Sequence, residues 1–377
     1  MLPVKYPSTS LGPSQRILLG PGPSLMSPRV MQALAQPMLS HLDPQFVEIM
    51  DDVRARLMRV FQAPPGSFAF AVSGTGTSAM ETAVANLVAP GTRVLSVVTG
   101  YFADRLAQMA TRYGGDVTRV EAEWGRAIDP DQVRLALKAS GAAIVTIVHA
   151  ETSTGVLNPV HAVAALAREH GALVIVDAVT SLGGMPLDVA GWDLDAVYSC
   201  SQKCLGAPSG ISPIVFSPRA LEKKVSCRSF YFDVALLEDY WVRRKYHHTM
   251  SASLVYALQA ALAGVEEEGL EARWARHERH HLAFAAALKH IGLTLLPPEG
   301  ERLWTLNAVT VPPGVDDAAV RRFLLQNFNI EIGAGLGPLA GKVFRVGLMG
   351  TSSSQELVDL LSGALETAIN SVVQGLH

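Results

Sequence analysis

The feature that most constrains the fold is an alternation of short apolar runs with stretches of helical spacing, from residue 68 to residue 216. The apolar runs have the length of strands, and most are followed by residues whose apolar positions recur every three or four. Such alternation is typical of βαβ units, so we expect an α/β fold around a mostly parallel sheet. The expected strands span residues 68–72, 93–98, 116–120, 143–148, 173–176, 196–199 and 214–216.

A second, smaller domain is expected after a helical pattern that ends near residue 265. The next stretch, 266–281, is polar and rich in Glu and His, and we place the passage between domains there. Beyond it, alternating strand and helix patterns indicate a small α/β domain with antiparallel pairing. The expected division is an N-terminal arm (1–18), a large domain (19–270) and a small C-terminal domain (271–377).

Composition narrows the class of protein. Hydrophobic residues make up 49% of the 377 residues and charged residues 17%, which favours a packed core over disorder. The net charge of -3 lacks the basic excess of a nucleic-acid binder. The N-terminus has no apolar signal core, no apolar run could span a bilayer, and the three cysteines fit neither a disulfide framework nor a metal site. We therefore expect a cytoplasmic protein without membrane, nucleic-acid or metal partners.

Lys203 lies at the end of an apolar strand, within the run Ser-Cys-Ser-Gln-Lys-Cys-Leu-Gly of residues 199–206. Burial lowers the pKa of a lysine, and the neutral amine is the form that attacks an aldehyde to make a Schiff base. A lysine that extends from the strand end into solvent is the alternative that this segment leaves open.

Asp177 ends the apolar run 173–176, at the side of the sheet where ligands of α/β proteins gather. A carboxylate there can keep the ring nitrogen of pyridoxal 5′-phosphate (PLP) protonated, and the protonated ring accepts electrons from a substrate carbanion. A helix cap is the alternative role for this residue.

Residues 73–78, Ser-Gly-Thr-Gly-Thr-Ser, join a predicted strand to a helix-like run. Free N–H groups and the helix dipole make such a turn an anion site, and we expect a phosphate there, although a plain turn is also compatible. The segment lacks the third glycine of a Rossmann loop and the lysine of a P-loop, which disfavours nucleotide binding.

Arg345 is a charge within the apolar run 343–348. If buried, its guanidinium needs an anionic partner, and its two parallel N–H groups suit the α-carboxylate of an amino acid. Exposure on the alternating face of the strand is the alternative.

Seven motifs occur in one order along the chain, in residues 20–23, 73–77, 149–155, 176–179, 201–203, 246–249 and 335–345. In that order they resemble the class V aminotransferases, and more closely the alanine-glyoxylate and serine-pyruvate aminotransferase group, over nearly the whole chain. The resemblance implies the fold type I architecture of PLP enzymes, a homodimer with active sites at the subunit interface, and ping-pong transfer of an amino group.

The resemblance also implies a role for each site residue. Lys203 would form the internal aldimine and then move the proton between the substrate and the cofactor, while Asp177 would pair with the pyridinium. Arg345 would receive the substrate carboxylate, Thr152 would stand near the ring hydroxyl and the substrate, and the backbone around Gly22 would line a small substrate pocket. The other implied cofactor-binding residues are Thr75, Gly76, Thr77 and Gln202 at the phosphate, Tyr246 and Thr249 at the phosphate from the other subunit, Phe102 (or Tyr101, if the loop is shifted by one) stacked on the ring, and Val179.

The implied reaction transfers the amino group of L-alanine or L-serine to glyoxylate, giving glycine. The nearest alternative is an (S)-ureidoglycine-glyoxylate aminotransferase, a group similar in having Gln-Phe-Asp-Pro at residues 41–44 and Asn-His-His-Thr at residues 246–249. This chain has His41 and Tyr246 instead, which removes amides suited to a ureido group. Pyridoxamine-pyruvate transfer and a non-catalytic PLP-binding regulator are further alternatives.

Cysteine and histidine patterns favour no other chemistry. A cysteine desulfurase needs a mobile nucleophilic cysteine well after the Schiff-base lysine, and no cysteine follows Cys227. We expect Cys200 and Cys204 to be small buried residues beside Lys203. His277, His280 and His281, interleaved with Arg and Glu, are expected on a solvated helix face rather than in a metal site.

Overall fold

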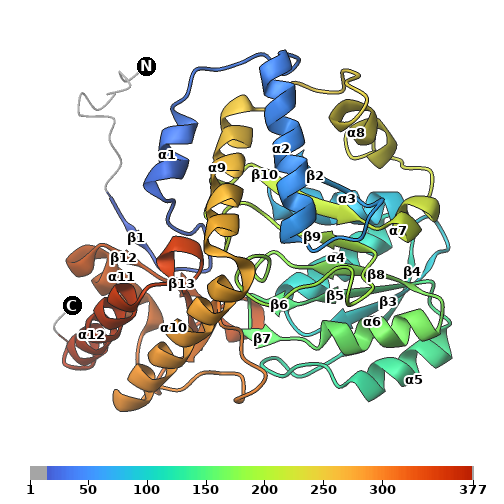
Figure 1. Cartoon of the computed structure of the whole chain (residues 1–377). Helices are drawn as coiled ribbons and strands as arrows, with labels where there is room; N and C mark the ends of the chain where they lie inside the picture. Colours follow the sequence, from blue (N-terminus) through green and yellow to red (C-terminus); the bar gives the residue numbers. More distant parts are fainter. Residues whose placement is uncertain (1–14, 376–377) are drawn as a thin grey trace, which may run out of the picture.

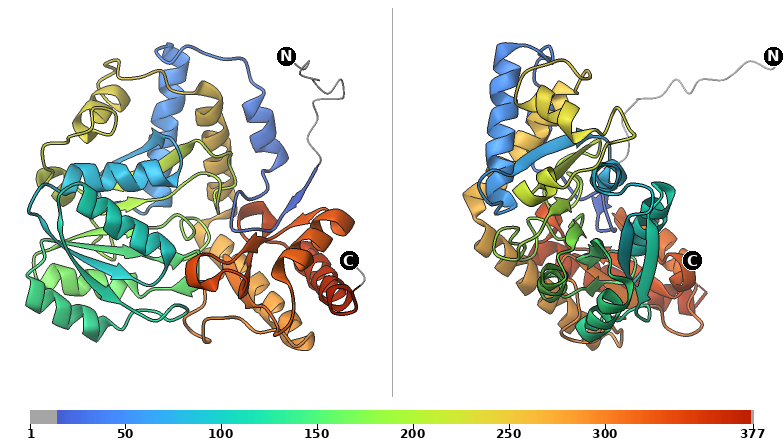
Figure 2. Two further views of the ribbon diagram at one scale, coloured as in Figure 1. Left: turned by 180° about the vertical axis from the view of Figure 1, so that it is seen from behind. Right: turned by 90° about the vertical axis from the view of Figure 1, so that its right-hand side faces the viewer.

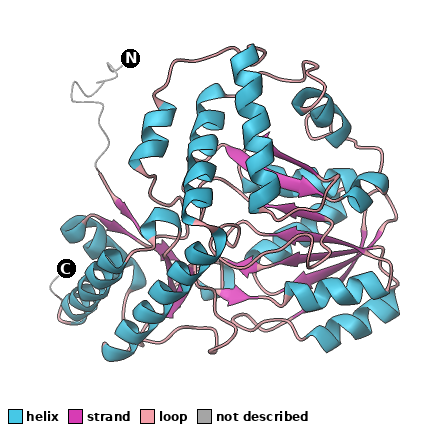
Figure 3. Ribbon diagram, viewed as in Figure 1, coloured by secondary structure: helices cyan, strands magenta, loops and turns pink. Residues whose placement is uncertain are grey.

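The computed structural model describes residues 15–375, and a seven-stranded sheet lies at the centre of its larger part (Figures 1 and 3). The strand order is β2-β10-β9-β8-β5-β3-β4, and all neighbours are parallel except where β10 pairs with β2 and β9. The predicted mostly parallel sheet is confirmed. Its strands are β2 (Phe68–Ser73), β3 (Arg93–Val98), β4 (Asp116–Glu121), β5 (Ile144–Val148), β8 (Leu173–Asp177), β9 (Ala196–Tyr198) and β10 (Ile211–Phe216).

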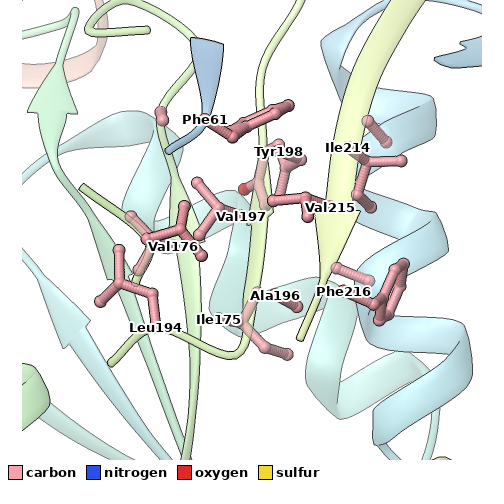
Figure 4. Packing of buried hydrophobic residues seen from close by; sticks show 14 of the residues in the cluster. Phe61, Ile175, Val176, Leu194, Ala196, Val197, Tyr198, Ile214, Val215 and Phe216 are labelled. Carbon is pink, nitrogen blue, oxygen red and sulfur yellow. The ribbon is translucent and has the colours of Figure 1, made fainter. Parts of the chain in front are cut away.

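The central strands β5, β8 and β9 are buried along their whole length, because other elements cover both faces of the sheet. Figure 4 shows side chains of β8, β9 and β10 packed together with Phe61 and Leu194. The register of β8 and β9 pairs Asp177 with Tyr198, the last residue of each strand. Two polar side chains therefore meet at the carboxyl edge of an apolar sheet.

Several helices begin where the sequence supplies a capping side chain followed by proline. Asp43, Asp129 and Ser217 each accept a backbone N–H, and each precedes a proline in the first turn. At α3, the N-cap Thr75 makes no such side-chain bond. Within residues 15–375, no helix is both long and apolar enough to cross a membrane. The helices of the larger part are α1 (Pro28–Leu34), α2 (Pro44–Val60), α3 (Gly76–Leu87), α4 (Tyr101–Arg112), α5 (Pro130–Ser140), α6 (Val160–Glu169), α7 (Pro218–Glu222), α8 (Val234–Trp241) and α9 (Ala252–Glu268).

The C-terminal part has its own hydrophobic cluster, which includes Phe284 and Phe344, and an antiparallel sheet of order β11-β14-β13. The strand β1 pairs with β12, and Leu19 packs into the same cluster, so the start of the described chain lies with this part (Figure 2). The prediction assigned residues 17 and 18 to a separate arm and Leu19 to the large domain, and it did not anticipate their packing against the C-terminal part. Residues 1–14 of the predicted arm lie outside the described residues. The remaining elements are β1 (Ile17–Leu18), β6 (Ala150–Glu151), β7 (Val156–Leu157), α10 (Leu270–His290), β11 (Leu306–Thr310), α11 (Asp317–Phe328), β12 (Ile330–Glu331), β13 (Gly333–Ala334), η1 (Gly337–Leu339), β14 (Val343–Gly347), η2 (Gly350–Ser352) and α12 (Gln355–Val373).

The polar stretch 266–281 is helical apart from a break at Gly269, whose φ of +81° separates α9 from α10. The prediction that His277, His280 and His281 lie on a solvated face is wrong, because their exposed fractions are 0%, 5% and 3%. Each Nδ1 lies within 3.0 Å of a protein oxygen. The interleaved charges resembled a surface helix, but α10 packs its histidine face against the rest of the protein.

Candidate active site

A pocket opens at the carboxyl edge of the large sheet, where β5, β8 and β9 end beside the N-terminus of α3. Parallel strands place the residues that follow them on one side of the sheet, which is why segments far apart in the sequence meet here. The pocket is lined by Thr75, Gly76, Thr77, Met80, Phe102, Arg105, Val148, Thr152, Asp177, Val179, Cys200, Gln202 and Lys203.

Lys203 extends into this pocket from the turn that follows β9. Its amine donates a hydrogen bond to the carbonyl of Pro21, and its own carbonyl accepts one from Ser24 Oγ at 2.7 Å. Burial lowers the pKa of the amine. The alternative, in which this lysine extends from the strand end into solvent, is therefore not observed.

Gly22 approaches Lys203 so closely that no side chain fits between them. A Cβ on this residue would lie 2.6 Å from both the Nζ and the Cδ of Lys203, and its φ of +110° is one that other residues rarely adopt. The lysine therefore packs against bare backbone.

Asp177 is buried at the end of β8, with an exposed fraction of 3%. Its Oδ2 accepts a hydrogen bond from the Tyr198 hydroxyl at 2.9 Å, and its Oδ1 accepts one from the Val179 N–H at 2.8 Å. Desolvation raises the pKa of the carboxyl group to about 7, because these two hydrogen bonds only partly offset it. Tyr198 was not identified from the sequence, where the only signal for it is its position at the end of the next parallel strand.

The N-terminus of α3 faces the pocket with Thr75, Gly76 and Thr77. The first N–H groups of a helix have no partner within it, and the helix dipole favours an anion there. Beside them, the buried side-chain oxygen of Gln202 has no hydrogen-bond partner among the described residues. The helix end therefore favours a negatively charged group, while the amide oxygen of Gln202 is an acceptor that can take a donor from a ligand.

Phe102, and not Tyr101, lines the pocket from the first turn of α4. The start of α4 is held by Glu151, whose buried carboxyl group accepts hydrogen bonds from Phe102 N at 3.4 Å and Ala103 N at 3.0 Å. Desolvation raises the pKa of Glu151. Neither Glu151 nor Arg105, one helical turn after Phe102, was identified from the sequence, because their contacts depend on α4 beginning at Tyr101.

Arg345 is buried on β14, with an exposed fraction of 8%, so exposure on the alternating face does not occur. Its Nε donates to Ala334 O at 2.6 Å and its Nη1 to Thr152 O at 3.4 Å. Arg345 forms no salt bridge with any residue in 15–375, and burial lowers the pKa of its guanidinium to about 10. A buried guanidinium without a salt-bridge partner among these residues is suited to bind a carboxylate.

Tyr246 and Thr249 do not line the pocket. Both are exposed, Tyr246 by 63%. The residues between them are buried: His247 Nδ1 lies 2.8 Å from His248 Nδ1, and His248 Nε2 lies 2.9 Å from Ser73 Oγ. A cofactor role for the two exposed residues requires a second subunit and stays a prediction.

Comparisons with known proteins agree with this architecture. Residues 18–361 match the family described as Aminotransferase class-V. The chain is 38% identical to an alanine-glyoxylate aminotransferase of Drosophila melanogaster, over 96% of this chain and 94% of that one. It is 37% identical to an (S)-ureidoglycine-glyoxylate transaminase of Bacillus subtilis, over 94% and 90% of the two chains. The structure of an alanine-glyoxylate aminotransferase from Nostoc sp. superposes with a TM-score of 0.93 at 46% identity, covering 96% and 97% of the chains.

Proposed function

The chain belongs to the class-V aminotransferases, and from this premise we propose that it transfers the amino group of L-alanine or L-serine to glyoxylate, giving glycine. It is a PLP-dependent enzyme whose substrates are amino acids and oxo acids. The observation that carries the proposal is the buried guanidinium of Arg345, which has no acidic partner among residues 15–375 and donates to Thr152 of the lysine pocket.

The residues of the pocket fit PLP. The uncapped N-terminus of α3 suits the phosphate, and the unpartnered buried amide oxygen of Gln202 marks a polar group available to a ligand. Asp177 suits the ring nitrogen, because a cation beside this buried carboxyl group would return its pKa toward the ordinary value. When bound, PLP supplies a ring that accepts the electron pair of the substrate's Cα–H bond.

We propose a separate role for each of the main residues at the pocket. We assign Lys203 to carry the proton at the substrate Cα, since burial lowers the pKa of its amine and so favours the neutral form that can accept a proton. We assign Arg345 to hold the carboxylate, Asp177 to stabilise the positive ring nitrogen, and Phe102 to pack on the ring face. Thr152 joins the two halves, because it lines the pocket and its carbonyl contacts Arg345.

A small amino acid is supported by the space around the lysine. The amine contacts the Pro21 carbonyl and the backbone of Gly22, so this wall of the pocket is main chain that cannot rotate away. A short side chain such as the methyl of alanine or the hydroxymethyl of serine suits such a wall.

Ureidoglycine is the second candidate donor, because the Bacillus subtilis relative is named for it. Two of the positions at which this chain departs from that group's pattern, His41 and Tyr246, contact each other, with ring centroids 5.3 Å apart. Their joint exchange supports the choice of alanine or serine.

We also propose a homodimer in which Tyr246 and Thr249 reach the phosphate of the partner's site. The cytoplasmic location stays a prediction.

The test is an absorbance titration of the purified protein with PLP, followed by addition of L-alanine, L-serine or ureidoglycine and then glyoxylate. We expect a near-visible band that alanine or serine abolishes and glyoxylate restores. Lys203→Ala should bind PLP without this interconversion, and Arg345→Met should bind PLP normally but need far more amino acid. Bleaching by ureidoglycine alone would refute the proposed donor.

A further inference from the structure

Arg105 is a positioned cation at the phosphate end of the pocket. It lines the pocket from α4, and its guanidinium carbon lies 5.1 Å from the ring centroid of Phe102 and 5.3 Å from that of Tyr101. Two cation–π contacts with rings that are nearly perpendicular to each other favour this position of the guanidinium. The side chain is therefore held beside the ligand site.

The guanidinium also orients a hydroxyl at the N-terminus of α3. Nη1 of Arg105 donates to Thr77 Oγ1 at 3.2 Å. A hydroxyl whose oxygen accepts a hydrogen bond keeps its own hydrogen for a different acceptor. Thr77 lines the pocket in the first turn of α3, so its hydroxyl is left as a donor toward an anion bound at that helix end.

The positive charge of Arg105 is not neutralised locally. No salt bridge within residues 15–375 includes it, whereas its neighbour Asp104 pairs with Arg119 at 2.7 Å. Glu81, on the facing helix α3, accepts a hydrogen bond from Tyr113 at 2.9 Å instead. The charge is thus available to an anion at the pocket.

We propose that Arg105 is a positioning residue for a phosphate monoester, which presents the Thr77 hydroxyl as a donor and adds positive charge at the phosphate end of the cofactor. This inference rests on the proposed PLP-dependent function. Under this proposal, Lys203 and Asp177 interact with the aldehyde and ring of the cofactor, whereas Arg105 and Thr77 interact with its phosphate.

The test compares PLP with pyridoxal, which has the same ring and aldehyde but no phosphate. We would titrate the full chain, freed of cofactor, with each ligand and follow absorbance for wild type, Arg105→Gln and Arg112→Gln. Arg112 is exposed on the same helix, so its replacement makes the same change in net charge without touching the pocket. We expect the dissociation constant of PLP to rise about tenfold in Arg105→Gln, as befits one charge-assisted hydrogen bond, and that of pyridoxal to change less than about twofold.

A double-mutant cycle tests the route through Thr77. If Arg105 acts by orienting that hydroxyl, Arg105→Gln combined with Thr77→Val should lose less PLP affinity than the two single losses added together. Arg105→Lys, which keeps the charge but not the planar fork, should weaken PLP less than Arg105→Gln. Melting temperatures without cofactor should match wild type.

Two results would overturn the proposal. Equal weakening of PLP and pyridoxal by Arg105→Gln would mean that the residue only supports the Phe102 ring, and unchanged PLP affinity would mean that it has no role in binding. A wild-type protein that binds neither ligand would instead refute the proposed function itself.

Discussion

Replacing Gly22 with alanine should lower both the free energy of unfolding and the reaction rate, and comparison with a second glycine replacement distinguishes the two effects. The new Cβ would lie 2.6 Å from Lys203 Nζ, whereas a relaxed contact between heavy atoms needs about 3.5 Å, so the amine must retreat by about 0.9 Å. The colliding atoms are the end of a flexible side chain, so the main loss of stability comes from the positive φ and amounts to about 1 to 3 kcal/mol. A displacement of that size at a reacting group costs roughly a hundredfold in rate.

Gly171→Ala is the matched control, because Gly171 also has a positive φ, of +72°, but nothing lies within 4 Å of its added Cβ. Denaturant unfolding should show losses of about 1 to 3 kcal/mol for both variants. Stopped-flow absorbance of the PLP-loaded enzyme with L-alanine should show the large rate loss only for Gly22→Ala. A wild-type rate in Gly22→Ala, or an equal rate loss in both variants, would refute the inference that the lysine is held against this backbone.

Two other predictions concern pH and donor choice. Because the pKa of Asp177 is raised from 3.8 to about 7, the cofactor-free folded protein holds an extra proton between about pH 4 and 7, so its free energy of unfolding should fall as pH rises through that range. Denaturant unfolding of Asp177→Asn should lack this slope, and an unchanged slope would contradict the assignment. Exchanging His41→Gln and Tyr246→Asn together should raise the rate with ureidoglycine relative to alanine by more than the two single exchanges combined, since the rings are in contact; additive effects would count against this pair as a determinant of the donor.

Much of the fold was predictable because it depends on local patterns. Strands such as β5 and β8, buried along their whole length, appear in the sequence as largely apolar runs, and each predicted strand of the large sheet is present. The antiparallel direction of β10 was not predictable, because an apolar run carries no information about its direction. The association of β1 with β12 escaped prediction for a similar reason, since a two-residue strand has no periodicity.

The site was predictable where a residue's chemistry stands out against its neighbours. Lys203, Asp177 and Arg345 are charges that end or interrupt apolar runs, and all three lie at or beside the pocket. Tyr198 and Glu151 were missed because a tyrosine in a strand and a glutamate after one are ordinary until the hydrogen bonds that they make are known. The buried histidines of α10 were misassigned because neighbouring charges concealed a face that packs inward.

The segment that follows β1 contacts both sides of the site. Leu19 O accepts a hydrogen bond from Gly347 N at 2.8 Å, which ties the segment to the strand that carries Arg345. Two residues later, Pro21 O accepts one from the amine of Lys203. A three-residue stretch of main chain, from Leu19 to Pro21, therefore contacts both the strand that carries the guanidinium and the amine of Lys203. Lengthening this segment by one residue would therefore move the main chain that contacts the amine relative to the strand that carries the guanidinium, although neither side chain would change.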